Sequence, residues 1–273
     1  MSSGPSRLRA ALRRNRGRAY TVLPLMPVEE AWHRALSRAG TQAIQAREDA
    51  EVAGVLSAIG GPRSADVVTI IPTYERGELL QQAVASALAQ DVEDHLVVTI
   101  HDGGTITRLP DDPQLLQLAL SANPGIAGIV RNIGIRATTS RLVGFLDDDN
   151  TWLPNHLPLA LAAHARPGVH LTYSDIGWFG PDGKDLGVLG RPFSRRQLAH
   201  ENYIDINSVV AARSLDPTFS RVPRKKVSFT AEDWELAWRL SKQTPPLHLE
   251  EVTVRYLVNP DSYFTDHTRT LGR

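Results

Sequence analysis

The feature that most constrains the fold is the alternation of short apolar runs with amphipathic segments between residues 66 and 150. The runs at 66–72, 96–104 and 141–150 are rich in Val, Ile and Leu, and the first ends at a proline. Such short, β-branched runs are typical of buried strands in a parallel sheet. The segments at 77–90 and 125–137 carry apolar residues at helical spacing.

The order strand, helix, strand, helix, strand predicts an α/β fold with a parallel sheet and right-handed crossovers. Ligands of such sheets bind beyond the carboxyl ends of the strands. The three expected strands all end in polar sequence, namely Pro-Thr-Tyr-Glu at 72–75, His-Asp-Gly-Gly at 101–104 and Asp-Asp-Asp-Asn at 147–150. One acidic turn is ordinary, but three such ends at one sheet edge predict a functional site.

The triplet Asp147, Asp148 and Asp149 raises the question of how three neighbouring carboxylates are tolerated. Adjacent like charges require solvation or neutralisation by a cation. A solvated acidic turn is the simpler explanation for an isolated triplet. The two other polar strand ends favour a site instead.

Composition limits the classes of protein to consider. A chain of 273 residues with 42% apolar content can build one large domain or two small ones. The absence of cysteine excludes disulfides and thiolate chemistry and fits a reducing compartment. No apolar run approaches the roughly 18 residues of a membrane span, and the first residues lack the apolar stretch of a secretory signal. We expect a soluble, cytoplasmic protein.

Charge is unevenly distributed, although the formal net charge is zero, which gives no reason to expect a specific nucleic-acid partner. Residues 1–20 hold six arginines and no acid, so this arm is +6 and the remainder −6. Two interpretations stay open. The arm is a disordered, solvated tail, or it tethers the protein peripherally to an anionic polymer or to the inner membrane face without inserting.

The remaining elements divide the chain into four parts. Residues 1–20 form the arm, and 21–65 an N-terminal helical segment in which 28–59 predicts one or two helices, a candidate surface for packing against a partner. Residues 66–153 form one half of the main domain. Residues 154–273 form the other half, with helices at 156–165 and 230–243, a hairpin around 181–184 and strands at 169–174 and 248–258. Thr230 is the expected N-cap of the later helix.

Five sequence pieces, in order and spacing, resemble the family 2 glycosyltransferases of the GT-A fold. They are DVVTIIPTYERGELLQQAVASALAQ, VVTIHDGG, NPGIAGIVRNIGIRA, VGFLDDDNTWLP and TAEDWELAWRL, within about residues 66–260. The resemblance implies a GT-A type, mostly parallel sheet with flanking helices. A Rossmann-like nucleotide-sugar half would cover 66–153, and a mixed acceptor half 154–273.

The same resemblance implies an inverting transfer of a sugar from a nucleotide-diphosphate donor to an acceptor hydroxyl, with Mn²⁺ or Mg²⁺. A UDP-sugar is the favoured donor. Asp149 would bind the metal, while Asp147 or Asp148 would complete the metal shell or contact the nucleotide. The acceptor could be a polysaccharide, a lipid-linked intermediate or a natural product, read by the segment around 187–208.

The resemblance also assigns residues to the nucleotide. Tyr74 would stack on the base, and Asp102 would accept a hydrogen bond from it; Asn123 would lie near the ribose and base, and Arg131 near the nucleotide. For Arg131 a surface ion pair stays open as an alternative. The remaining residues of the first nucleotide loop are Pro72, Thr73 and Glu75.

Inverting transfer needs a general base within hydrogen-bond reach of the acceptor hydroxyl. The resemblance assigns this role to Asp233, with Glu232 orienting the acceptor or Asp233. Acids in a first helical turn are also commonplace, because the helix dipole favours them there. Trp234 and Trp238 lie four residues apart on one helix face, which favours core packing over sugar stacking.

The chain departs from the family pattern at three positions. His101 stands where the family usually has a further acid, and Leu257 and Asn259 stand where members often have Arg and a metal-contacting His. His267 is a candidate substitute, so the third metal ligand stays open. Two other functions were weighed: a non-catalytic nucleotide-sugar sensor or scaffold, and a nucleotidylyltransferase, which would need a Gly- and Arg-rich loop that PTYERGE does not provide.

Overall fold

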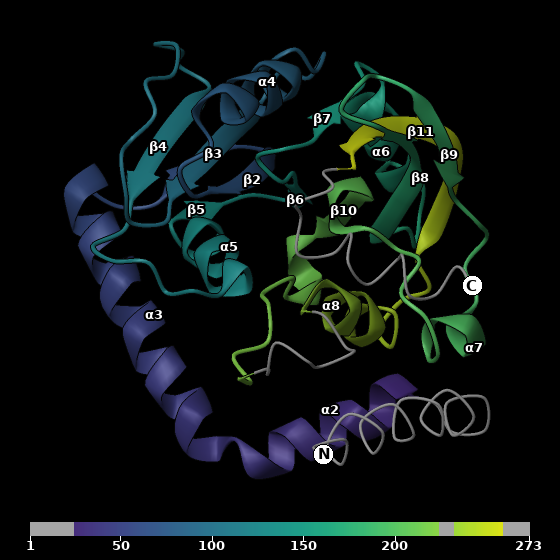
Figure 1. Cartoon of the computed structure of the whole chain (residues 1–273), viewed down its shortest axis with the longest axis horizontal. Helices are drawn as coiled ribbons and strands as arrows, with labels where there is room; N and C mark the ends of the chain where they lie inside the picture. The colour runs from purple at the N-terminus through teal and green to yellow at the C-terminus, as the bar shows by residue number, and fades with distance from the viewer. Residues whose placement is uncertain (1–24, 224–231, 259–273) are drawn as a thin grey trace, which may run out of the picture.

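The protein is built around one nine-stranded mixed sheet with helices on both faces (Figure 1). The computed structural model describes residues 25–223 and 232–258. The strands follow the order β4-β3-β2-β6-β10-β8-β11-β7, with β9 beside β8, and β1 and β5 form a separate pair. The strands are β1 (Arg63–Ser64), β2 (Val67–Thr73), β3 (His95–His101), β4 (Leu115–Ala119), β5 (Thr138–Thr139), β6 (Leu142–Phe145), β7 (Thr151–Trp152), β8 (Leu171–Phe179), β9 (Asp185–Leu189), β10 (Val209–Ala212) and β11 (Leu247–Leu257).

Helices precede, separate and follow these strands. In the described part of the chain, the α-helices are α2 (Leu25–Leu36), α3 (Arg38–Ile59), α4 (Gly77–Leu88), α5 (Ala127–Arg136), α6 (His156–His164), α7 (Arg195–Leu198) and α8 (Glu232–Leu240). Two 3₁₀ turns, η1 (Ile206–Ser208) and η2 (Arg213–Leu215), flank β10. None of the helices in these ranges combines the length and apolarity that spanning a bilayer requires.

The parallel part of the sheet consists of β4, β3, β2 and β6. All seven residues of β3 are buried, as a strand covered on both faces requires. The chain moves from β2 to β3 in one direction and returns past β2 to reach β6, so right-handed crossovers place α4 and α5 on opposite faces. This arrangement confirms the α/β prediction and makes the carboxyl end of β2 the switch point of the sheet.

The second half of the chain extends the same sheet. β10 runs antiparallel to β6 and β8, and β11 runs parallel to β8 and antiparallel to β7. The predicted hairpin is confirmed as β8 and β9, with Gly183 in the left-handed region in its turn. Sequence analysis assigned no element to β4, an edge strand with a mixed burial pattern. Thr230, the expected N-cap of α8, lies outside the described residues.

The two N-terminal helices pack on the domain in different places. α3 lies along α5, where Val52 and Val55 join the core. α2 lies against α8, and Met26 at its start is fully buried and donates its N–H to the carbonyl of Ala199 at 3.0 Å. The predicted helical segment at 28–59 is therefore two helices that cover two separate parts of the same domain.

A buried carboxylate fastens α3 to the domain. Glu48 is fully buried, and its Oε2 accepts hydrogen bonds from Nε of Arg221 at 2.8 Å and from Nδ2 of Asn132 at 3.1 Å. Its Oε1 accepts from Nη2 of Arg221 at 2.5 Å and from Nη1 of Arg136 at 2.9 Å. Four bonds from three residues, two of them on α5, satisfy the charge, as burial of an ionised group demands.

Replacing this carboxylate should therefore destabilise the fold. We expect Glu48→Gln to lower the free energy of unfolding by about 2–4 kcal/mol, because two guanidinium groups lose a buried counter-charge. Urea denaturation at neutral pH, with midpoint and slope compared, measures the loss. Asp49→Asn is the matched control, since Asp49 pairs with the same Arg136 at the surface and should have little effect. Equal losses in the two variants would contradict this role of Glu48.

Candidate functional site

The three polar strand ends lie side by side, as the sequence predicts. β2 lies between β3 and β6, and Thr73 at its end is level with His101 at the end of β3. Ile70 of β2 is level with Phe145, after which the chain enters the Asp triplet. The segments 72–75, 101–104 and 147–150 therefore follow three adjacent parallel strands at the switch point of the sheet.

The first loop presents an exposed aromatic side chain next to the end of β2. Pro72 and Thr73 end β2, whereas the side chain of Tyr74 is 48% exposed. Glu75, also exposed, has a φ of 52°, in the left-handed region that non-glycine residues seldom adopt. Such conformations concentrate at functional loops. Tyr74 thus has a free ring face available to a planar ligand.

The second loop depends on a glycine. Gly103 has a φ of 64°, and a Cβ added to it would lie 2.6 Å from the backbone nitrogen of Asn123. Only glycine allows this loop to approach the 121–125 segment so closely. Asn123 is exposed, and its Oδ1 accepts from the N–H of Gly125 at 2.5 Å, so its side chain shapes its own loop.

Helix α3 supports the 121–125 segment from outside. Nη2 of Arg47 donates to the carbonyl of Asn123 at 2.7 Å, and Glu51 accepts from the N–H of Ser121 at 3.0 Å. The N-terminal helical segment therefore holds a loop to which the sequence assigns a nucleotide-binding residue. No sequence signal pointed to Arg47 or Glu51, because the contact joins segments about 75 residues apart.

Asp102 and His101, at the end of β3, lie in different environments. Asp102 has one carboxylate oxygen buried without a hydrogen-bond partner in the described structure, and burial raises its pKa to about 6. An unpartnered carboxylate oxygen beside Tyr74's loop is a ready acceptor for a ligand N–H. His101, which stands in place of an acid, is buried within the sheet, and burial lowers its pKa.

The three adjacent charges of the Asp triplet are tolerated because the carboxylates pair with different partners. Asp149 pairs with Nη1 of Arg76, at the start of α4, and the same guanidinium lies 3.9 Å from Asp148. Burial raises the pKa of Asp148 to about 6, while Thr73 and Arg76 oppose the shift. For Asp149, burial and the charge of Asp147 raise the pKa. Among the described residues, Asp148 and Asp149 thus share one guanidinium, that of Arg76.

Asp147 pairs with Arg131 and not with Arg76. Arg131 of α5 is buried, with 5% exposure, and its guanidinium donates to Asp147 through Nη2 and to Glu232 at 3.0 Å through Nη1. The alternative of a surface ion pair for Arg131 therefore does not hold. The buried guanidinium connects the end of β6 with the start of α8, which are the two candidate regions for donor and acceptor chemistry.

Asn207 is a site residue that the sequence analysis missed. Its Oδ1 accepts from the backbone N–H of Asp147 at 2.6 Å, and its Nδ2 donates to the Asp147 side chain at 3.2 Å. The same Nδ2 donates to Asp205 at 2.7 Å. Burial and the nearby charge of Asp147 raise the pKa of Asp205 to about 7. The Asp-Ile-Asn spacing, which favours a capped turn, was the one available signal.

The acids that open α8 have separate partners. The Glu232 carboxylate accepts from Arg131 and from the backbone N–H of Gly128 in the first turn of α5. Oδ1 of Asp233 accepts from the N–H of Trp234 at 2.8 Å, and Oδ2 accepts from Nδ2 of Asn202 at 3.2 Å. Burial raises the pKa of both acids. Trp234 and Trp238 are buried, which confirms the core-packing prediction.

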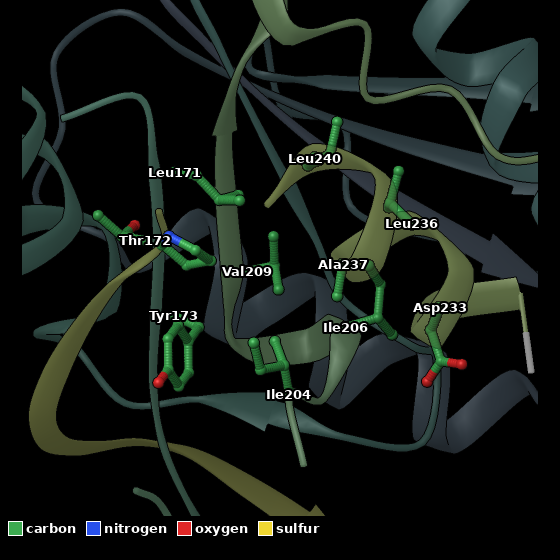
Figure 2. A pocket seen from close by; sticks show the side chains of 11 residues that line it. Leu171, Thr172, Tyr173, Ile204, Ile206, Val209, Asp233, Leu236, Ala237 and Leu240 are labelled. Atoms are coloured by element: carbon green, nitrogen blue, oxygen red, sulfur yellow. The ribbon is translucent and has the colours of Figure 1, made fainter. Parts of the chain in front are cut away.

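Asp233 stands at the end of a small apolar cavity between β8, η1 and α8 (Figure 2). Asp233 is the one carboxylate among the residues that line this cavity. The others are Leu171, Thr172, Tyr173, Ile204, Ile206, Val209, Leu236, Ala237, Leu240 and Pro246. Apolar surroundings disfavour the charged form of an acid and raise its pKa. A carboxylate in this setting is suited to accept a proton during a reaction.

The comparison with protein families identifies this arrangement. The model of glycosyl transferase family 2 matches residues 68–209, just over half of the 273 residues. The chain belongs to glycosyl transferase family 2. The matched region runs from β2 to the first residue of β10, so it contains the strand ends, the Asp triplet and Asn207, and it ends before α8.

Curated relatives of this glycosyltransferase are similar over part of their length. The succinoglycan biosynthesis protein ExoO of Rhizobium meliloti is 29% identical over 49% of this chain and 38% of its own. The poly(ribitol-phosphate) β-N-acetylglucosaminyltransferase TarP of Staphylococcus aureus is 28% identical over 61% of this chain and 54% of its own. The matches thus span about two fifths to a half of these relatives.

Solved glycosyltransferase structures share the fold. S. aureus TarS 1–349 in complex with UDP-GlcNAc has a TM-score of 0.56 and 17% identity, covering 73% of this chain and 60% of TarS 1–349. The mannosyltransferase PcManGT of Pyrobaculum calidifontis, in complex with GDP-Man and Mn²⁺, has a TM-score of 0.55 and 16% identity, covering 87% and 72%. The predicted GT-A fold is confirmed.

The Asp triplet is the candidate site for a divalent cation in this family 2 chain. Among residues 25–223 and 232–258 there is no cluster of three or more His, Cys, Asp or Glu side chains placed to hold a metal ion. Mg²⁺, however, is commonly held by one or two carboxylates together with substrate phosphates. Asp147 and Asp149 offer such oxygens, and the pKa of Asp149 is raised by burial and by the charge of Asp147, which a cation would offset. Asn259 and His267 lie outside the described residues.

The contribution of the buried Arg131 guanidinium to the free energy of unfolding should depend on pH. Without the guanidinium, no cation of the described residues lies among Asp147, Glu232 and Asp233. We therefore expect Arg131→Met to lower the free energy of unfolding by about 2–4 kcal/mol at pH 8. A carboxylate with a raised pKa in the folded protein costs stability above that pKa and nothing below its unfolded-chain value. Burial raises the pKa of Glu232 and of Asp233, and Arg131 opposes this shift. Its removal should raise both pKa values further, so the deficit should shrink as the pH falls to 5.

Urea denaturation of Arg131→Met and of the parent at pH 5 and pH 8 measures this difference. Arg141→Met is the matched control, because Arg141 makes an exposed ion pair with Asp66 that should contribute little. A deficit for Arg131→Met that stays constant with pH would contradict the assigned role of the guanidinium.

Proposed function

We propose that this family 2 glycosyltransferase transfers a sugar, with inversion, from a nucleotide-diphosphate donor to an acceptor hydroxyl with the help of Mn²⁺ or Mg²⁺. The observation that carries the proposal is the Arg131 bridge, which holds Asp147, at the switch point of the sheet, next to the first turn of α8. A donor carboxylate cluster and a candidate base therefore lie on either side of one guanidinium.

The donor would lie along the three strand ends. The exposed ring of Tyr74 is positioned to stack on a base, and the unpartnered oxygen of Asp102 to accept a hydrogen bond from it. Asn123 would act mainly through the shape of its loop. The diphosphate would lie toward Asp147 and Asp149, where a bound divalent cation would neutralise the charge that develops on the leaving group.

The acceptor would approach Asp233. In the reaction, the acceptor oxygen attacks the anomeric carbon, the bond from that carbon to the diphosphate oxygen breaks, and Asp233 takes the hydroxyl proton. Asn202 and the N–H of Trp234 fix the Asp233 carboxylate, and the apolar cavity behind it limits solvation. Glu232 is engaged by Arg131 and Gly128, so we assign it to holding the site together rather than to contact with the acceptor.

Two finer points, the donor and the acceptor, rest on similarity alone. A UDP-sugar is favoured as donor because TarS was solved with UDP-GlcNAc and TarP is named as an N-acetylglucosaminyltransferase, although PcManGT was solved with GDP-Man. The relatives' names include biosynthesis of succinoglycan and transfer to poly(ribitol-phosphate), which favours a polymeric acceptor. The cytoplasmic location stays a prediction.

The assignment of the base can be tested with Asp233→Asn. This variant keeps the shape of the side chain but cannot take the proton, so we expect kcat to fall by about 10²–10⁴ while donor affinity stays within about twofold. Turnover and donor binding, measured on the same preparations, separate the two effects. Asp185→Asn, an exposed change on β9, is the control. Normal turnover by Asp233→Asn would exclude it as the base.

The donor site can be tested by calorimetric titration with UDP, GDP and dTDP, each with and without Mn²⁺. We expect one nucleotide to bind at least about tenfold more tightly with Mn²⁺, because the cation bridges phosphate and carboxylate oxygens. Asp149→Ala should remove this gain, and Asp111→Ala, an exposed substitution, should not. Affinity for a nucleotide that is the same with and without Mn²⁺ would contradict the metal site and leave the nucleotide site intact.

A further inference from the structure

Helix α2 carries an exposed apolar stripe on the face that points away from the domain. Val28, Trp32 and Leu36 are 53%, 65% and 67% exposed and lie four residues apart, so they line one side of the helix. Ala31 and Ala35, also exposed, fill the positions between them. Single exposed apolar residues are normal on protein surfaces, but three large ones in register form a patch that suggests a binding surface.

The opposite face of α2 is fixed to the domain, which sets the direction of the stripe. Arg34 donates to the buried Glu235 of α8 at 3.1 Å and to Glu30 at 3.0 Å, and Met26 is fully buried. Figure 1 shows α2 along the edge of the molecule next to α8. The stripe of Val28, Trp32 and Leu36 therefore cannot turn inward without breaking these contacts.

The sequence directly before α2 indicates what the stripe contacts. Residues 1–20, which lie outside the described residues, contain six arginines and no acid. Peripheral binding to a membrane commonly combines a basic segment with an amphipathic helix that carries Trp and Leu on its apolar face. Trp is also enriched where protein meets the headgroup region of a bilayer. Both signals occur here within the first 36 residues.

We propose that the stripe of α2, together with the Arg-rich arm, docks the protein on an anionic phospholipid surface. Each arginine near such a surface raises binding by about fivefold, and the stripe supplies the apolar contact that charge alone lacks. A second copy of the chain is a poorer occupant. A symmetric contact through α2 would bring two arms of charge +6 toward one interface, and their repulsion opposes association. The docking stands whether or not the proposed donor and acceptor assignments hold.

The test is sedimentation of the full chain with vesicles of phosphatidylcholine, with or without about 30% phosphatidylglycerol. We expect binding to the anionic vesicles, weaker binding to the neutral ones, and loss of binding at high salt. Val28→Ser/Trp32→Ser/Leu36→Ser should reduce the partition coefficient at least about tenfold. Leu186→Ser/Val188→Ser is the matched control, because these β9 residues are similarly exposed, at 48% and 58%, on another surface.

A second measurement distinguishes docking through α2 from attraction of the arm alone. Brominated lipids quench tryptophans that enter the bilayer interface, so they should quench the parent and not Trp32→Phe, which should still bind. Equal binding by the parent and the triple Ser variant, or quenching unchanged in Trp32→Phe, would overturn the proposal. A third outcome would also overturn it: the parent does not bind anionic vesicles but self-associates, and the triple Ser variant does not self-associate. A second copy of the chain would then occupy the stripe.

Discussion

The buried guanidinium of Arg131 is the interaction on which the rest of the site depends. It comes from a helix that is buried along almost its whole length between the sheet and α3, so its position is fixed by packing before any charge is considered. Its two bonds then place Asp147, after the parallel part of the sheet, and Glu232, at the start of α8, in a fixed relation. Asp233 follows Glu232 in the same turn. The separation of the proposed donor and base groups thus depends on this one side chain.

The site concentrates negative charge and compensates it locally. Asp147 turns to Arg131 and Asn207, Asp149 to Arg76, and Asp233 to Asn202 and a backbone N–H. Several of these acids nevertheless have raised pKa values because they are buried close together. Such a cluster favours ligands that bring positive charge or protons, which is consistent with a cation at the strand ends and proton transfer at α8.

The parallel half of the fold could be predicted from the sequence, because a buried strand or an amphipathic helix has a recognisable local pattern of apolar residues. The sequence did not predict β4, since that edge strand mixes partly buried, exposed and buried residues without a regular alternation. Site residues could be predicted from the sequence where they directly follow a strand or begin a helix, as with Asp102, the Asp triplet and Asp233. Asn207 and Arg47 were missed because their contacts bridge 60 and 76 residues of chain. Arg131 is surrounded by Asp147, Phe219 and Glu232, and no local pattern reveals that these residues meet there.

The position of α3 has a consequence for where this domain begins. The family match starts at residue 68, yet Glu48, Val52 and Val55 belong to the interior, and Arg47 and Glu51 hold a loop of the site. A chain trimmed to the family boundary would expose the outer face of α5 and leave the guanidinium groups of Arg136 and Arg221 without the buried carboxylate they share. The evolutionary unit and the folding unit therefore differ here, and the minimal autonomous unit extends at least to α3.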